Sequence, residues 1–130
     1  METLSNNENI RKLIRLSKRL HDDSQIIYRK LKKQGYIISL RGYQKFIDEL
    51  EVYYPYDFIR IMNSGIDLIL WCETLREIRR LIEHVISEEE DEEVLQTFSK
   101  YEILLTENIK IIEEILKETR KDLAEAPLSQ

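Results

Sequence analysis

Breaks in the chain are scarce in this sequence, and that scarcity constrains the fold more than any other feature. Only three glycines and two prolines interrupt the 130 residues. Because glycine and proline mark most turns, their rarity favours a few long helices over many short strands. Hydrophobic residues make up 42% of the chain, which is enough for a core and excludes wholesale disorder. A chain of this length is expected to build one core.

The single cysteine and the apolar runs limit the cellular setting. Cys72 has no second cysteine to pair with, so an internal disulfide and a secreted disulfide scaffold are excluded. The longest apolar run, 66–72, contains Asp67 and is far too short to span a bilayer. The polar residues 1–10 do not resemble a signal peptide. We therefore expect a cytoplasmic protein that makes no membrane contact.

Charge is divided unevenly along the chain. Residues 1–50 contain 11 lysines and arginines against 6 acidic residues, whereas residues 51–130 contain 9 against 19. An asymmetry of this kind is typical of a half that faces nucleic acid joined to a half that faces solvent or a partner. Charges that only decorate helix surfaces explain it equally well.

Helical spacing is clearest in the first third of the chain. Apolar residues repeat every three or four positions over 8–21, and basic residues occupy the other face, which predicts an amphipathic helix. The polar run 21–24 predicts a turn, and a second helix is expected over 24–34. Gly35 then fits the left-handed position that ends a helix.

A third helix is expected after a short extended segment. Residues 36–38 are β-prone and predict an extended connector, and Ser39 is a candidate N-cap for a helix over 40–52. The following stretch, 58–71, has two interpretations. Either it is a β-hairpin that turns at 63–65, or it forms helices broken at the same place.

The second half of the chain predicts a helical hairpin. One helix is clear over 72–86, and Ser87 with Glu90 forms a candidate capping box for a last helix that reaches about residue 123. The apolar stripe of that helix has heptad-like spacing with an asparagine in the seam, which is typical of helices that dimerise. Packing onto 72–86 of the same chain explains the stripe equally well. The residues assigned to the dimer seam are Phe98, Tyr101, Leu105, Asn108, Ile112 and Ile115.

The most specific motif lies over residues 24–50, about a fifth of the chain. It contains LKKQGY at 31–36, ISLR at 38–41 and a spaced apolar face beyond them. This pattern resembles the helix-turn-helix of winged-helix DNA-binding domains. The resemblance implies a positioning helix, a turn at Gly35 and a recognition helix over 40–51 that enters the major groove of double-stranded DNA.

Candidate DNA contacts follow from the chemistry of that segment. Arg41 can donate two hydrogen bonds to guanine, Gln44 can pair with adenine in the same way, and Lys45 can reach guanine or a phosphate. Ser39 suits a phosphate at the start of the helix. Further phosphate contacts are expected from basic residues before the turn and from one on the possible wing. These are Arg11, Lys12, Arg15, Lys18, Arg19, Lys30, Lys32, Lys33 and Arg60.

A second resemblance is confined to Arg79 and His84. An arginine followed by a histidine five positions later resembles the catalytic signature of the all-α HEPN ribonucleases. A solvated helix face explains this pair as well. The two histidines and the single cysteine lie apart in the sequence, and the acids at 88–93 lack the spacing of a calcium loop. We therefore expect no metal, no cofactor and no enzymatic activity.

Together these patterns predict a mainly α protein. We expect a winged-helix-like helix-turn-helix module over 8–71, with a possible short β-hairpin, and a C-terminal helical hairpin over 72–126 that dimerises. Residues 1–7 and 127–130 are expected to be flexible tails. The predicted function is a sequence-specific transcriptional regulator that binds double-stranded DNA as a homodimer at a palindromic site. The alternatives are an all-α protein–protein interaction subunit and a HEPN-like ribonuclease.

Overall fold

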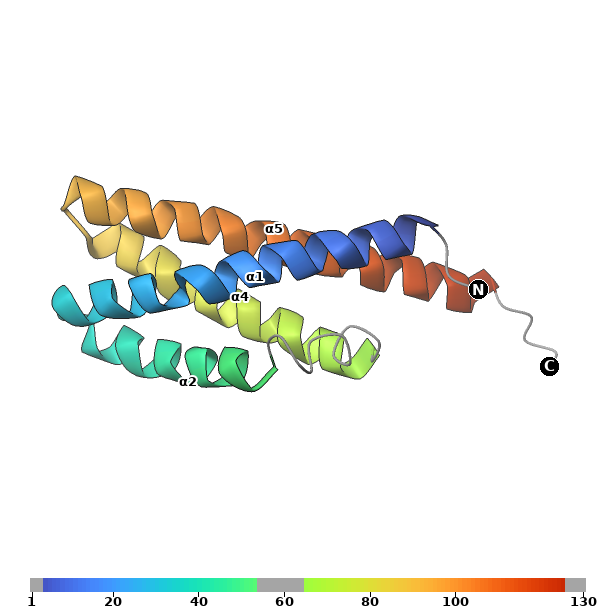
Figure 1. Ribbon diagram of the computed structural model, residues 1–130, viewed down its shortest axis with the longest axis horizontal. Helices are drawn as coiled ribbons and strands as arrows, with labels where there is room; N and C mark the ends of the chain where they lie inside the picture. The colour runs from blue at the N-terminus through green and yellow to red at the C-terminus, as the bar shows by residue number, and fades with distance from the viewer. Residues whose placement is uncertain (1–3, 54–64, 126–130) are drawn as a thin grey trace.

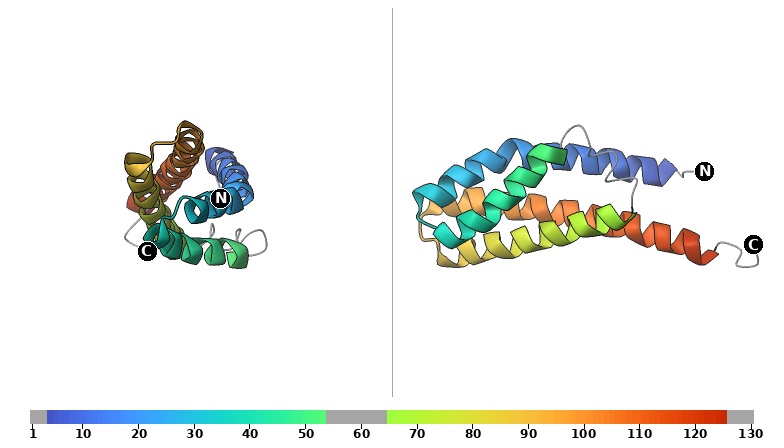
Figure 2. Two further views of the ribbon diagram at one scale, coloured as in Figure 1. Left: turned by 90° about the vertical axis from the view of Figure 1, so that its left-hand side faces the viewer. Right: turned by 90° about the horizontal axis from the view of Figure 1, so that it is seen from below.

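A computed structural model describes residues 4–53 and 65–125, with side chains over 8–51 and 68–118. All the secondary-structure elements in this part of the chain are α-helices, which confirms the mainly α prediction. The helices are α1 (Leu4–Lys33), α2 (Ile37–Tyr53), α4 (Gly65–Glu88) and α5 (Glu92–Glu125). Neighbouring helices along the chain run in opposite directions, and the packed pairs α1–α2, α2–α4, α4–α5 and α5–α1 close a ring (Figures 1 and 2).

The helices of the bundle differ in length. α1 and α5 have 30 and 34 residues, whereas α2 has 17. The start of α1 and the end of α5 therefore extend past α2 at one end of the molecule, as the right-hand view of Figure 2 shows. The α1–α2 and α4–α5 connections lie together at the opposite end.

α1 passes straight through the residues predicted to form a turn. The segment 21–24 is helical, and α1 is continuous over its 30 residues. Ser24 is buried, and its Oγ donates a hydrogen bond to the carbonyl of His21 at 2.7 Å, so the side chain is satisfied within the helix. The prediction of two helices was wrong because the inner-face spacing continues through the polar run. That inner face consists of Leu13, Ser17, Leu20, Ser24, Ile27 and Leu31.

α1 ends as the sequence predicts, at a glycine in the left-handed conformation. Gly35 has a φ of +80°. The amide of Tyr36 donates to the carbonyl of Leu31 at 3.0 Å, and the amide of Gly35 donates to that of Lys32 at 3.2 Å. These two bonds form a Schellman motif, which satisfies the last carbonyls of α1 and reverses the chain.

α2 begins earlier than predicted, two residues after the reversal at Gly35. Residues 37 and 38 are already helical, so the expected extended segment over 36–38 is wrong. The amide of Leu40 donates to the carbonyl of Tyr36 at 2.8 Å, which places the first helical hydrogen bond ahead of Ser39. Ser39 therefore lies in the first turn of α2 and is not its N-cap.

The second arm of the possible β-hairpin is helical. Residues 66–71 belong to α4, and the interpretation as a helix is correct for them. Leu68 and Leu75 are buried seven positions apart, so a helical stripe, and not an alternating strand, faces the core. The first arm, 58–62, lies outside the described residues, as does Arg60. A winged helix is therefore not confirmed, and the described part of the chain contains no strand.

α5 begins later than predicted, and a different residue caps it. Asp91 Oδ1 accepts hydrogen bonds from the amides of Glu93 and Val94 at 3.0 and 3.3 Å, as an N-cap does. Ser87 lies in the last turn of α4, where its hydroxyl donates to the carbonyl of His84 at 2.6 Å. The predicted capping box at Ser87 is therefore wrong.

One hydrophobic core is shared by the four described helices, and the predicted boundary at 71/72 falls inside α4. Two polar contacts lie within this core. The Tyr43 hydroxyl of α2 donates to the Tyr101 hydroxyl of α5 at 2.8 Å. Ser17 of α1 donates to Asn108 Oδ1 of α5 at 3.2 Å, and Asn108 Nδ2 donates to a carbonyl of its own helix. A shift of one helix along another would leave these buried polar groups without partners, which costs free energy.

α2 approaches α4 closely at Gly42. A Cβ atom on this residue would lie 3.0 Å from Leu81 Cδ1. The missing side chain therefore allows the two helices to pack together at this point.

Candidate nucleic-acid interface

α1 is the only described helix with a positive net charge. It carries nine lysines and arginines against three acidic residues. By contrast, α2 carries two against three, α4 three against five, and α5 five against nine. The uneven charge of the sequence is therefore concentrated on one helix of the bundle.

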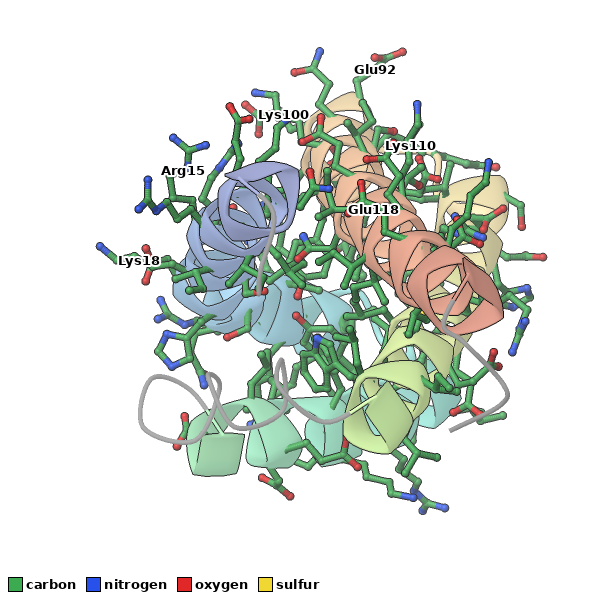
Figure 3. The ribbon with its side chains drawn as sticks, turned by 90° about the vertical axis from the view of Figure 1, so that its right-hand side faces the viewer. Arg15, Lys18, Glu92, Lys100, Lys110 and Glu118 are labelled. Carbon is green, nitrogen blue, oxygen red and sulfur yellow. The ribbon has the colours of Figure 1, made fainter. Side chains whose placement is uncertain are left out.

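Five basic side chains of α1 form one outward face. They are exposed, and their helical spacing places them opposite the buried inner face of α1. Figure 3 shows Arg15 and Lys18 projecting from α1 away from the other helices. We name this surface the basic face. It consists of Arg11, Arg15, Lys18, Arg29 and Lys33.

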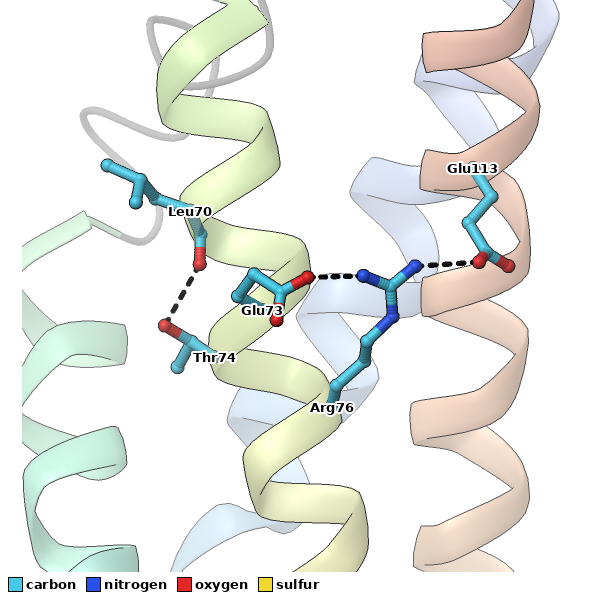
Figure 4. A network of polar contacts seen from close by, with 5 residues as sticks. All are labelled: Leu70, Glu73, Thr74, Arg76 and Glu113. Carbon is cyan, nitrogen blue, oxygen red and sulfur yellow. Dashed lines mark hydrogen bonds and ion pairs between the residues drawn. The ribbon is translucent and has the colours of Figure 1, made fainter.

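Acidic neighbours do not neutralise the basic face. None of the nine basic side chains of α1 makes an ion pair with a described residue. On α4, by contrast, Arg76 lies between Glu73 and Glu113, with its Nη2 2.7 Å from Glu113 Oε2 (Figure 4). Arg79 Nε is 3.6 Å from Glu83 Oε1. These two arginines are engaged within the bundle, whereas the cations of α1 are available to an external anion.

The basic residues of α1 form two clusters with a gap between them. Residues 20–28 separate the clusters and contain no lysine or arginine. Asp22 and Asp23 lie in this gap, and Asp22 is exposed on the side of the basic face. The N-terminal cluster is Arg11, Lys12, Arg15, Lys18 and Arg19, and the C-terminal cluster is Arg29, Lys30, Lys32 and Lys33.

The predicted recognition helix lies within α2. Arg41 and Lys45 are exposed, whereas Ser39 and Gln44 are half-buried. Gln44 Nε2 donates to Asp48 Oδ1 at 2.9 Å, so part of the amide is already engaged. The structure brings the predicted base-reading residues to one exposed side of α2, with the carboxylate of Asp48 among them.

α1 and α2 form an antiparallel helical hairpin. They run side by side in both views of Figure 2, and the inner side of α2 is buried in the shared core. In a helix-turn-helix the two helices instead cross at roughly 90–120°. The resemblance over 24–50 thus extends to two helices and a glycine-ended turn, while the packing geometry is that of a bundle. The three predicted phosphate contacts Lys30, Lys32 and Lys33 occupy the last turn of α1.

Glu89 holds the α1–α2 connection against the α4–α5 connection. Its carboxylate accepts hydrogen bonds from Gln34 Nε2 at 3.2 Å and from the Tyr36 hydroxyl at 3.0 Å. Loss of hydration raises the pKa of Glu89, but these bonds and those from the Asp91 and Glu90 amides outweigh it, so the pKa lies below its ordinary value. Burial, followed by the bond to Glu89, raises the pKa of Tyr36 to about 12.

The six residues assigned to a dimer seam are buried within one chain. Tyr101 contacts Tyr43, and Asn108 contacts Ser17. The face of α5 that carries them packs on α1, α2 and α4 of the same chain, as the intramolecular interpretation of the stripe expects. They are Phe98, Tyr101, Leu105, Asn108, Ile112 and Ile115.

The other sequence candidates lie on the surface of α4. Arg79 is paired with Glu83, and His84, five positions along the same helix, is exposed. Within the described residues, no three or more potential metal-ligating side chains converge. None of the described helices combines the length and apolar character needed to cross a membrane.

Sequence reasoning missed the continuity of the basic face. The turn expected at 21–24 placed Arg29 and Lys33 on a different helix from Arg11 and Arg15. The sequence signal that places these four residues on one helix is the unbroken spacing of inner-face residues on either side of the polar run.

Comparisons of the chain with models of protein families, with curated proteins and with solved structures find no match.

Proposed function

We propose that this protein binds double-stranded DNA through the basic face of α1. The observation that carries the proposal is that the one positively charged described helix presents five exposed cations on one face, none of them paired with a described acid. Lysine and arginine side chains arranged in this way contact phosphates, and each contact releases counterions condensed on the DNA.

The spacing of the cations also favours an external anion. Arg11 and Arg15 are four positions apart, as are Arg29 and Lys33. Like charges at this spacing destabilise a helix by roughly 0.2–0.5 kcal/mol per pair. A bound polyanion reverses this cost, because each cation then lies beside a phosphate.

A sequence-specific transcriptional regulator is the finer form of this function. It requires Arg41, Gln44 and Lys45 to reach base edges in the major groove. The exposure of Arg41 and Lys45 supports such a role, whereas the Gln44–Asp48 hydrogen bond of 2.9 Å competes with it. The geometry favours phosphate contact along α1 over base reading by α2, so the proposal is stated at the level of DNA binding.

Fluorescence anisotropy of a labelled random-sequence duplex of about one to two helical turns tests the proposal. We compare the wild type with the triple variant Arg11→Gln/Arg15→Gln/Lys18→Gln at low salt. The variant makes fewer phosphate contacts and therefore releases fewer counterions on binding. We expect it to bind at least about tenfold more weakly. Glutamine is a good helix former, so α1 should remain intact.

The matched control is Arg80→Gln/Lys100→Gln/Lys110→Gln, which removes the same charge from exposed positions of α4 and α5. We expect this control to bind within about twofold of the wild type. Equal losses in the two triple variants would mean that only net charge matters and would contradict a site on α1.

Two further outcomes separate the competing functions. Stronger loss in Arg41→Ala/Lys45→Ala than in the α1 variant would move the contact to α2 and favour the sequence-specific regulator. No binding by the wild type at low salt would contradict the proposal, since phosphate attraction does not depend on sequence and should be detected by anisotropy at low salt. The protein–protein interaction subunit would then be the better account of the basic face.

A further inference from the structure

We infer that α1 spans the major groove of the duplex, with its N-terminal cluster on the phosphates of one strand and its C-terminal cluster on those of the other. This inference rests on the proposed function and adds how the duplex is held. It comes from the juxtaposition of two cationic clusters on one continuous helix, separated by a segment that carries only acidic formal charges.

The length of the gap matches one groove of B-DNA. Arg19 and Arg29 border the gap and are ten positions apart, which corresponds to about 15 Å along an α-helix. The major groove is about 12 Å wide, and the minor groove about 6 Å. A helix laid across the mouth of the major groove therefore brings its two clusters to opposite backbones, whereas the minor groove is too narrow for this gap.

The acidic residues in the gap fit the same arrangement. Asp22 is exposed on the side of the basic face. On a helix laid along a single backbone, this carboxylate would face phosphates and be repelled by them. Over the open groove it faces base edges, where the amino groups of cytosine and adenine are hydrogen-bond donors.

The spacing between the clusters is fixed by the core. Leu20, Ser24 and Ile27 lie in the gap segment and are buried against the rest of the bundle, which holds that segment in helical form. The described exposed residues of α1 include no aromatic side chain that could stack on a free base, and Tyr28 is half-buried. Proteins that bind single strands combine a cationic groove with such stacking, so the lack of exposed aromatic side chains in the described part of α1 favours a duplex.

Two charge-reversing variants test this geometry. Glu8→Lys adds a cation one turn before the N-terminal cluster, and Asp22→Lys adds one in the gap. Both positions are exposed, and both changes alter the net charge equally. The dependence of affinity on salt counts the phosphates neutralised, at about −0.9 in logarithmic slope per contact. We expect Glu8→Lys to steepen this slope on a duplex by about one and Asp22→Lys to steepen it by much less.

A single strand of the same length provides the comparison. It has no groove, so we expect the two variants to change its affinity equally. Equal steepening on the duplex would overturn the inference, because the cations would then act as one uniform surface. Gln25→Lys, also exposed in the gap, serves as a second gap variant, and thermal melting confirms that each variant is folded. If the wild type binds no duplex, the proposed function itself is contradicted, and this result differs from equal steepening by the two variants.

Discussion

At the residue scale, buried hydroxyl and amide groups link helices across the core. Tyr43 and Tyr101 are almost fully buried, and their hydroxyls form a hydrogen bond of 2.8 Å between α2 and α5. Burial raises the pKa of both hydroxyls, so both remain protonated and one can donate to the other. Each is satisfied only while its partner is present, which makes the pair sensitive to single substitutions.

Tyr43→Phe and Tyr101→Phe should each destabilise the fold by about 1–3 kcal/mol, because each leaves one buried hydroxyl without its partner. The double variant should cost less than the sum of the two, since no unsatisfied hydroxyl remains. Urea denaturation of the four proteins in a double-mutant cycle measures this coupling. Additive losses would contradict the importance of the hydroxyl pair.

The cap of α5 gives a second residue-scale prediction. Asp91→Ala should lower the free energy of unfolding by about 0.5–2 kcal/mol, because two amides of the first turn lose their acceptor. Ser87→Ala is the matched control and should have little effect, since its hydroxyl bonds only to a carbonyl within α4. Thermal melting of both variants distinguishes the two caps, and a larger effect at Ser87 would restore the capping box predicted from the sequence.

At the scale of elements, the sequence predicts helices and their inner faces but not where they break. The end of α1 at Gly35 is predictable because a positive φ favours glycine strongly. The turn expected at 21–24 is absent, because Ser24 satisfies its hydroxyl within the helix and lies on the buried face. Ser87 and Asp91 are both good caps by composition. In the structure Asp91 is the cap, and Glu89, which lies between the two candidates, accepts hydrogen bonds from the α1–α2 connection.

The candidate site shows the same limit. The positive first half of the chain and its individual cations are visible in the sequence, and the exposure of Arg41 and Lys45 agrees with the recognition-helix motif. The single basic face is not visible there, because it depends on α1 being unbroken. The heptad stripe of α5 is likewise compatible with packing on a second chain or on its own chain. In the structure its seam residues are buried against α1, α2 and α4.

The contact of Glu89 with the α1–α2 connection makes stability depend on pH. The pKa of Glu89 is lowered from 4.5 in the folded protein. The carboxylate therefore stabilises the fold fully above pH 4.5, and this stabilisation is lost as the pH falls through the lowered pKa. Glu89→Gln should therefore melt below the wild type at neutral pH, and the difference should shrink as the pH is lowered below 4.5 and through the lowered pKa. Thermal melting at neutral and at acidic pH checks this, and a difference that does not depend on pH would contradict it.

At the scale of the whole molecule, one positive helix packs with three negative ones around a shared core in the described part of the chain. The core contains residues of each described helix, so the apolar seam of α5 is buried within the chain. The other three described helices carry exposed cations among a larger number of acids, whereas on α1 the cations outnumber the acids by nine to three. Segregation of this kind steers a polyanion to one side of a protein whose overall charge is −5.

Because the seam is part of the core, its substitution should unfold the protein and not dissociate a dimer. Phe98 is fully buried, and Phe98→Ala should cost about 3–5 kcal/mol. Ile103→Ala, on the exposed side of α5, is the control and should change stability little. The urea midpoint of the wild type should not depend on protein concentration. A midpoint that rises with concentration would show that folding is coupled to dimerisation.

The most direct test of the central claim is where the duplex touches the protein. Amide chemical shifts of the isotope-labelled wild type can be followed by NMR as a short random-sequence duplex is added. We predict that the largest changes occur along the basic face of α1, in both its N-terminal and C-terminal clusters, with smaller changes over 39–48 of α2. Changes concentrated on 39–48, or no change at low salt, would contradict the claim that α1 is the DNA-binding element.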